Sequence, residues 1–431
     1  MKIFLEIIAV VLSLGAPIYW SITGFRKNIL AILVVLIFGA YVVWPLILIH
    51  ELSLNHYLDI QVESYIQQGL MLDILFMVLL VLGYELLGKK IHLKKFQETD
   101  IDTPLIHRFI IILYLIIFCL VYLNNSLAEV DLLGKWLGYT NQMTYGVKGL
   151  SYYLQNLLDS LVMLILIAYA TNLRKRYLAL MLVGAIFFII PFGFRYRLIY
   201  LILGFFILFI YKNQLSIKNL LAPLMLMLFL ILAFLFLGAN RTIIVGQEKN
   251  KQFTMQVLDI KKIVIQARGS YVDLAIYKGI DRGDIDHDHG KSFFYYTLIR
   301  AIPAKYFEGG KKPYPPNLMQ DVDKVLNLHA PADCPGCRTG EAQTIMGAIY
   351  YSFGAMGVAI VAFLVGGLLR FHAKNQQENY FSLMWGLATV LALFMFITRG
   401  YFPQVIDHWV YLVLPIIFLQ TASLRQCSYH R

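Results

Sequence analysis

Charged residues are scarce in this chain of 431 residues. They account for 15% of the sequence and hydrophobic residues for 59%, whereas a soluble globular protein has roughly 25% charged and roughly 45–50% apolar residues. The shortage of charge excludes an ordinary soluble fold. It predicts an all-α polytopic membrane protein, because a helix that crosses lipid must be apolar along most of its length.

Several well-defined catalytic and nucleotide-binding motifs are also missing. The chain has no Walker A motif, no Rossmann glycine pattern, no Gly-x-Ser-x-Gly elbow and no His-Glu-x-x-His pair. It has no internal repeat and no long polar linker. The net charge of +11 comes without the aromatic and basic pattern of a nucleic-acid groove, so we expect membrane lipids, and no nucleic acid, as partners.

Apolar runs long enough to cross a bilayer recur along the whole sequence. A spanning helix needs about 20 such residues. The first run is too long for a signal-peptide core and lacks a small-x-small cleavage site, so we take it as a span. We count about 11 spans, in the range of about 10–12. They lie at 3–22, 28–49, 68–88, 107–124, 153–172, 177–192, 197–211, 219–238, 344–369, 380–398 and 406–423.

Basic residues mark every second loop between these runs. Cytoplasmic loops carry an excess of lysine and arginine, and the alternate early loops are acidic or mixed. The basic positions are Arg26, Lys27, Lys89, Lys90, Lys94, Lys95, Arg174, Lys175, Arg176, Lys212, Lys218, Arg370, Lys374, Arg425 and Arg431. This pattern predicts an outer N-terminus and a cytoplasmic C-terminus.

The predicted topology divides the chain into three regions. Residues 1–238 form an N-terminal transmembrane bundle of about eight helices, and residues 344–431 add about three more. Between them, residues 239–343 form one large outer loop. The loop contains helical patches, for example Phe253–Ile280, so we expect a folded cap and not a flexible tether.

Arginines gather on the predicted outer side, where positive-inside logic does not explain them. Arginine binds phosphate through two parallel hydrogen bonds, so a set facing one cavity suits a pyrophosphate. The alternative for each is snorkelling or a loop carboxylate partner. The segment Phe192–Arg197 is the sharpest, because it places two arginines at a helix N-terminus, which favours an anion. The candidates are Arg195, Arg197, Arg241, Arg268, Arg300, Arg338 and Arg399.

Two residues are candidates for a general base. Glu341 lies where the large loop returns to the membrane; burial raises the pKa of such a carboxyl and suits it to a sugar hydroxyl. The alternative is an acid that stabilises the helix dipole. His408 follows Asp407 at the head of the last span and is either a base oriented by a carboxylate or a satisfied interfacial residue.

Metal binding is the weaker interpretation of two polar segments. Asp284–His289 is rich in acids and histidines but lacks a calcium-loop pattern, which favours a solvated turn. Cys334 and Cys337 enclose Pro-Gly and have no second Cys/His pair at zinc spacing, which favours a local disulfide. We therefore predict no metal and no cofactor.

Four stretches of the sequence resemble those of one family of membrane enzymes. A Gly-x-Arg segment opens a span, an Ile-Pro and a Lys-Pro pair lie in the large loop, and Thr-Gly-Glu precedes an aromatic, glycine-rich helix start. The chain thereby resembles the Wzy-type oligosaccharide repeat-unit polymerases of O-antigen and capsular polysaccharide. The stretches are Gly193–Arg197, Arg300–Pro303 with Lys311–Pro313, Thr339–Glu341 and Tyr351–Gly357, besides the spacing from Arg268 to Gly279.

The resemblance implies a GT-C-like bundle in the bacterial inner membrane with a periplasmic loop. The implied donor is a growing glycan on undecaprenyl pyrophosphate, and the acceptor is the hydroxyl of an incoming lipid-linked unit. The outer arginines would bind the pyrophosphate, and Glu341, ahead of His408, would take the proton. A chain-length regulator and a flippase are implied partners. The Cys-Pro-Gly-Cys segment departs from the family pattern.

Two other functions remain open from the sequence. An O-antigen ligase would use a similar fold with a different acceptor. A flippase or transporter for lipid-linked oligosaccharide belongs to another class, but such proteins usually show two similar halves, which this chain lacks.

Overall fold

The structure is a computed structural model of the whole chain. It describes residues 2–51, 63–87, 103–127, 150–190, 195–213, 269–302, 306–310, 343–375 and 380–429. All regular secondary structure in these ranges is helical, without strands, which confirms the predicted all-α class.

The helices follow the predicted apolar runs. Ten of the eleven runs fall on helices, and the run at 219–238 lies outside the described residues. The elements are α1 (Lys2–Phe38), η1 (Gly39–Val43), α2 (Trp44–Glu51), α3 (Glu63–Leu86), α4 (Thr103–Leu127), α6 (Leu150–Ala170), α7 (Lys175–Ile189), α8 (Arg195–Lys212), α12 (Gly269–Asp281), η4 (Lys291–Tyr295), α13 (Tyr296–Ala301), η6 (Glu308–Gly310), α15 (Ile345–Asn375), α16 (Tyr380–Arg399) and α17 (Phe402–Tyr429).

Seven stretches of the described residues are long and apolar enough to cross a membrane. Helix α7 has only 15 residues, and α8 carries Arg195, Arg197 and Lys212 within its 18 residues. The structure thus supports a multi-pass membrane protein, and the count of eleven spans stays a prediction.

The first of these stretches is two helical arms joined at Gly24. It runs from Lys2 to Leu48 without a loop, and a straight helix of that length would measure about 70 Å, more than twice the bilayer core. Gly24 has non-helical φ 158° and ψ 77°. The indole N–H of Trp44 donates to the hydroxyl of Ser13 at 3.1 Å, so the arms fold back on each other, as the separate runs 3–22 and 28–49 predict.

The described chain forms two compact units. The first comprises Met1–Ile91, Leu258–Lys374 and Ala392–Ile406, and the second comprises His92–Val257, Asn375–Leu391 and Asp407–Arg431. Helices α16 and α17 contribute residues to both units. The domain boundaries predicted at 238 and 343 rest on membrane topology and stay predictions.

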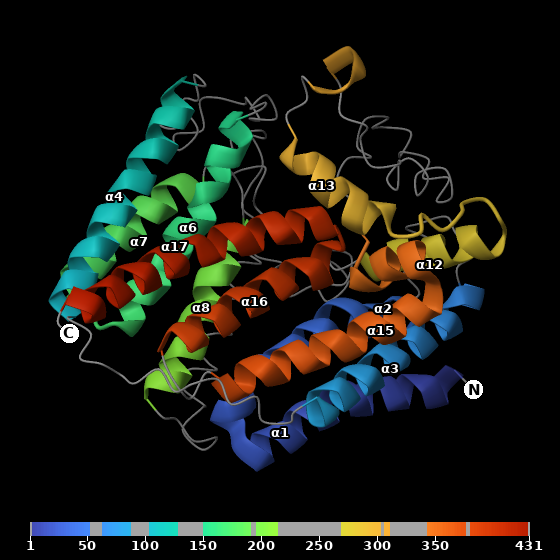
Figure 1. Cartoon of the computed structure of the whole chain (residues 1–431). Coiled ribbons are helices and arrows are strands. Elements are labelled where there is room, and N and C mark those ends of the chain that lie inside the picture. Colours follow the sequence, from blue (N-terminus) through green and yellow to red (C-terminus); the bar gives the residue numbers. More distant parts are fainter. Residues whose placement is uncertain are drawn as a thin grey trace, which may run out of the picture. The chain divides into compact units, whose positions relative to one another are not determined.

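In the first unit, two glycines let the backbones of α3 and α15 touch, and Figure 1 shows the two helices side by side. A Cβ on Gly83 would lie 2.1 Å from the carbonyl oxygen of Phe363, and one on Gly366 would lie 2.1 Å from that of Leu80. Small residues at such crossings allow close van der Waals packing of helices in lipid.

Helix α15 is interrupted at Gly354, whose φ of 64° is left-handed and suits glycine. The interruption leaves the carbonyl of Tyr351 open to the preceding loop. It accepts the backbone N–H of Asp288 at 3.2 Å and lies 3.1 Å from Nδ1 of His287. The turn between α12 and η4 is therefore hydrogen-bonded to α15.

The second unit is organised around α6. Residues Leu161–Ala168 of this helix are almost completely buried. The hydroxyl of Ser160 donates to the carbonyl of Tyr411 on α17 at 2.6 Å, and the hydroxyl of Tyr380 on α16 donates to the carbonyl of Ile167 at 3.1 Å. A central helix with polar side chains in its first half is thus enclosed by its neighbours.

Candidate functional site

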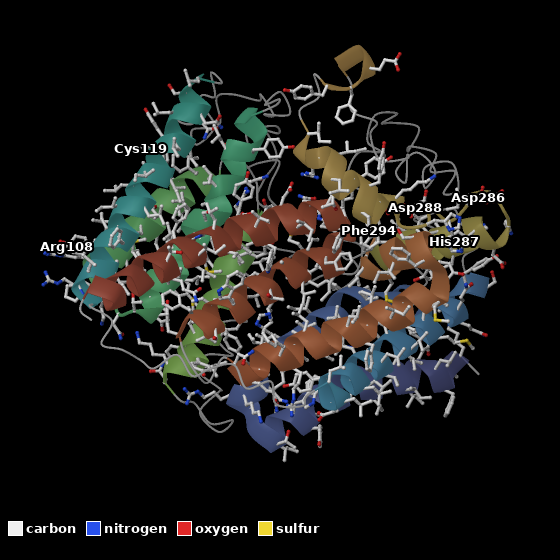
Figure 2. The ribbon with its side chains drawn as sticks, in the orientation of Figure 1. Arg108, Cys119, Asp286, His287, Asp288 and Phe294 are labelled. Atoms are coloured by element: carbon white, nitrogen blue, oxygen red, sulfur yellow. The ribbon has the colours of Figure 1, made fainter. Side chains whose placement is uncertain are left out.

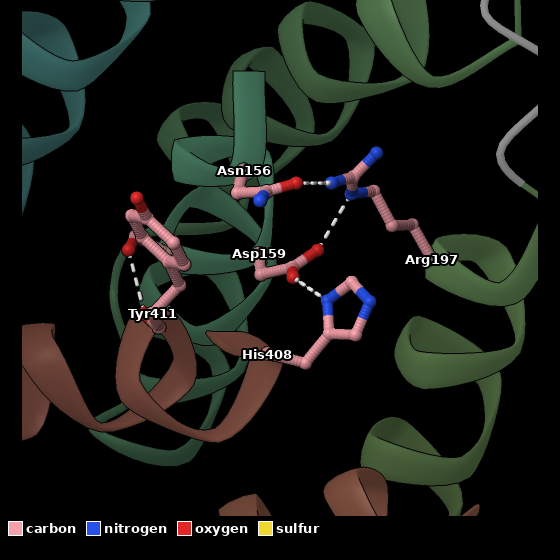
Figure 3. A network of polar contacts seen from close by, with 6 residues as sticks. Asn156, Asp159, Arg197, His408 and Tyr411 are labelled. Atoms are coloured by element: carbon pink, nitrogen blue, oxygen red, sulfur yellow. Dashed lines mark hydrogen bonds and ion pairs between the residues drawn. The ribbon is translucent and has the colours of Figure 1, made fainter. Parts of the chain in front are cut away.

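A buried charged network joins α6, α8 and α17 within the second unit. Asp159 accepts a hydrogen bond from Nε of Arg197 at 2.6 Å through one carboxylate oxygen. Its other oxygen is hydrogen-bonded to Nδ1 of His408, as Figure 3 shows. The side chains of Asp159 and Arg197 are 0% exposed and that of His408 is 1% exposed. We call these three residues the Asp159 network.

Three helices position the network. Asp159 is in the third turn of α6, Arg197 in the first turn of α8 and His408 in the second turn of α17. The predicted topology puts the N-terminal ends of all three helices on the outer side. The network thus lies near the middle of α6 and near the N-terminal ends of α8 and α17.

Neighbouring polar and aromatic groups hold Arg197 and His408 in place. The amide oxygen of Asn156 lies 3.4 Å from Nη2 of Arg197. The ring of Tyr196 lies 4.8 Å from the guanidinium carbon of Arg197 and 4.9 Å, centroid to centroid, from the imidazole of His408. Cation–π contact and edge-to-face packing both favour these arrangements.

The contact with Asp159 sets the chemistry of His408. A carboxylate only accepts hydrogen bonds, so Nδ1 carries the proton that it donates. Nε2 of the neutral ring is then an acceptor. This atom is buried and has no hydrogen-bond partner among the described residues. The arrangement can take a proton at Nε2, and Asp159 can then stabilise the imidazolium that forms.

The Asp159 network brings together two residues selected from the sequence. The sequence predicts Arg197 as an anion ligand and His408 as a base, and both contact Asp159. Arg195 opens α8, and its side chain is outside the described residues. The other candidates outside the described residues are Arg241, Arg268, Arg338 and Glu341.

Two candidate arginines belong to the first unit. The guanidinium carbon of Arg300 lies 5.8 Å from the ring centroid of Tyr401, and Arg300 is half-buried. Arg399 ends α16 with an exposed side chain. Arg300 thus has an aromatic neighbour, while the side chain of Arg399 is open to solvent.

Sequence reasoning missed Asp159 itself. The apolar run 153–172 predicts a span, yet Asp159 is an acid within it. Ionisable residues inside a membrane span are costly and need a partner. A search for an acid within one span and a base at the head of another would have paired Asp159 with Arg197 or His408.

Asp273 of α12 is hydrogen-bonded to Thr344, where the large loop ends and α15 begins. This buried carboxylate accepts the backbone N–H of Thr344 at 2.9 Å and is hydrogen-bonded to the Thr344 hydroxyl. The same hydroxyl accepts the N–H of Met346 at 3.1 Å, so Thr344 caps α15. Burial raises the pKa of Asp273 to about 7, although the hydrogen bonds from Thr344 oppose that rise.

The acidic turn after α12 is largely solvated, as the sequence favours. Asp284, Asp286 and His289 are exposed; Figure 2 labels Asp286 with its neighbours His287 and Asp288. Asp288 turns inward and accepts the backbone N–H groups of Gly290 at 2.9 Å and Ser292 at 2.8 Å.

Within the described ranges no cluster of three or more His, Cys, Asp or Glu side chains is arranged to hold a metal ion. The expected disulfide between Cys334 and Cys337 lies outside the described residues.

Comparison with known proteins bears on the C-terminal part of the chain. No curated protein and no solved structure matches the chain. The resemblance seen in the sequence is confirmed by a family model whose match covers α15, α16 and most of α17, including His408. Residues 340–427 match the family described as O-antigen polysaccharide polymerase Wzy.

Proposed function

We propose that the chain polymerises lipid-linked oligosaccharide repeat units, as an O-antigen polymerase does. The observation that carries this proposal is the overlap of two findings. The family match covers residues 340–427, and within that range His408 is oriented by a buried carboxylate with its second nitrogen unpartnered among the described residues. The matched region thus contains a group suited to activating a hydroxyl.

The proposed reaction transfers the growing glycan from undecaprenyl pyrophosphate to the incoming unit. The acceptor hydroxyl oxygen forms a bond to the anomeric carbon of the donor. The bond from that carbon to the pyrophosphate oxygen breaks, and its electron pair leaves with the pyrophosphate. The hydroxyl proton passes to a base. Because the donor is already activated, the reaction needs no nucleotide.

His408 fits the role of the base. Proton uptake at Nε2 makes an imidazolium, and Asp159 lies against its Nδ1 to stabilise the charge. The network changes from net neutral to net positive as the anionic leaving group develops, which favours the transition state electrostatically. Glu341 remains a second candidate for the base.

The arginines are proposed to bind the pyrophosphate. Nε of Arg197 already contacts Asp159, so Arg197 would act mainly through its charge, and Arg195 at the first position of α8 would reach the anion. The N-terminal end of that helix adds partial positive charge. The full proposed set is Arg195, Arg197, Arg241, Arg268, Arg300, Arg338 and Arg399.

The setting of this reaction is likewise a proposal. We place the chain in the bacterial inner membrane as a GT-C-like bundle of about eleven spans. The large loop faces the periplasm and the C-terminus the cytoplasm. A flippase would supply the lipid-linked units, and a chain-length regulator would act on the polymer.

Deletion of the coding sequence tests the function. Polymerase loss should leave surface glycan with a single repeat unit, visible as collapse of the ladder on a gel, and the intact chain should restore the ladder. Loss of all surface repeat units with accumulation of lipid-linked polymer would indicate a ligase. Accumulation of intermediates on the cytoplasmic leaflet would indicate a flippase.

A further inference from the structure

A second buried polar group lies on α6, four residues before Asp159, and has no assigned role. Gln155 on α6 is 6% exposed, and neither its amide nitrogen nor its amide oxygen has a hydrogen-bond partner among the described residues. Burying an unsatisfied amide is unfavourable by about 1–3 kcal/mol. A buried polar group in a folded protein is normally hydrogen-bonded, so Gln155 is expected to bind a water or a ligand.

The spacing along α6 directs Gln155 toward the network. Gln155 precedes Asp159 by four residues, so both side chains project from one face of the helix, about one turn apart. Asn156, the next residue, reaches Arg197 on α8. Gln155 is also the nearer of the two to the N-terminal end of α6, which is the outer end in the predicted topology.

The unsatisfied atoms define what kind of group can bind. Nε2 of His408 is an acceptor, and the Gln155 amide offers an acceptor oxygen and donor hydrogens. A phosphate oxygen accepts only, and it would be repelled by the lone pair of Nε2. An ammonium group only donates, so it leaves the donor hydrogens of the Gln155 amide without an acceptor. A hydroxyl can donate its one hydrogen to Nε2 of His408 and accept a hydrogen from the amide nitrogen of Gln155.

We propose that Gln155 and His408 form the subsite for the attacking sugar hydroxyl of the acceptor. The Gln155 amide holds the hydroxyl while its proton points at Nε2 of His408. Asp159 is a positioning residue, because it acts on the hydroxyl only through His408. The proposal rests on the polymerase function and assigns the acceptor end of the site, leaving the pyrophosphate to the arginines.

This role makes a distinctive prediction about stability. Gln155→Met replaces the amide with an apolar side chain of similar length. Because the lost amide is buried and unpaired, the substitution should leave the melting temperature unchanged or raise it. A subsite residue kept for function would therefore show lower activity at equal or higher stability.

The test uses the full-length protein in lipid nanodiscs with lipid-linked repeat units isolated from cells that lack the polymerase. We expect Q155M to reduce formation of products with two or more repeats by roughly 10- to 100-fold, which corresponds to one or two lost hydrogen bonds. Gln155→Asn, which keeps an amide on a shorter chain, should retain more transfer than Q155M.

Gln420→Met is the matched control. Gln420 lies twelve positions after His408 on the same helix, about 18 Å along its axis, where its amide oxygen accepts the indole N–H of Trp385 at 3.4 Å. Q420M should transfer at the wild-type rate. Transfer at the wild-type rate by Q155M would overturn the proposed subsite. The Gln155 amide would then be hydrogen-bonded to a buried water.

Loss of transfer together with a lowered melting temperature in Q155M would also overturn it, because the residue would then be structural. Failure of the polymerase function gives a different result. In that case the wild-type protein itself forms no product from the lipid-linked units, and both the polymerase function and the subsite are contradicted.

Discussion

Asp159 and His408 are 249 positions apart in the sequence, and their side chains share a buried hydrogen bond. The same carboxylate also binds Arg197. One acid on α6 therefore fixes both an arginine on α8 and a histidine on α17, and it sets the tautomer of the histidine. Substitution of Arg197 or of His408 should therefore have a measurable effect.

Arg197 is expected to be a stability determinant. Arg197→Met leaves the Asp159 carboxylate buried without its guanidinium partner, and breaking a buried ion pair in this way costs about 3–5 kcal/mol. The double variant Asp159→Asn with Arg197→Met should lose less than the sum of the two single variants, because it leaves no uncompensated charge. Thermal unfolding of the purified protein measures this, and strict additivity would argue against the ion pair.

The junction between α12 and α15 is expected to weaken as the pH rises. The pKa of Asp273 is raised to about 7 in the folded protein, so between its ordinary value and about 7 the folded state binds more protons than the unfolded state. Stability from this group is then fully present at low pH and is lost as the pH rises through about 7. Hydrogen exchange of α12 amides from pH 4 to 8 measures the change.

Asp273→Asn is the control for that pH dependence. An asparagine keeps an acceptor for the Thr344 N–H and cannot ionise, so the pH slope should disappear. Asp73 on α3 and Tyr277 on α12 interact electrostatically with Asp273. A slope that persists in D273N would assign the effect to one of those groups.

Close packing of α3 on α15 is expected to depend on Gly366. A Cβ there would meet backbone atoms of Leu80 and Tyr84, which cannot move aside as a flexible side chain does. Gly366→Ala should therefore lower the melting temperature. Gly15→Ala is the matched control, because nothing lies within 4 Å of a Cβ at Gly15. Equal melting temperatures for the two variants would contradict this helix contact.

The roles proposed for Arg195, Arg338 and Glu341 are tested together. Replacing Arg195, Arg338 or Glu341 with alanine should abolish polymer while protein levels stay normal, because each is proposed to contact the pyrophosphate or the acceptor. Immunoblotting and a surface-glycan gel provide the two measurements. Normal polymer from all three variants would show that Arg195, Arg338 and Glu341 are not part of the site.

The sequence predicted the helices well because an apolar run of about 20 residues is read directly from composition. It also selected Arg197 and His408, since each stands out at the head of a span. It did not reveal Asp159, because one acid among apolar neighbours barely changes the mean hydropathy of its run. The contact of Asp273 with Thr344 spans 71 positions, and a single sequence contains no signal for such a pairing.

The central claim is that His408 accepts the proton of the attacking hydroxyl. His408→Gln tests it most directly, because glutamine can still donate a hydrogen bond toward Asp159 but is no base. In a deletion strain, H408Q should accumulate to the wild-type level and yield surface glycan with a single repeat unit, a loss of about 100-fold or more in transfer. A wild-type glycan ladder from H408Q would contradict the account.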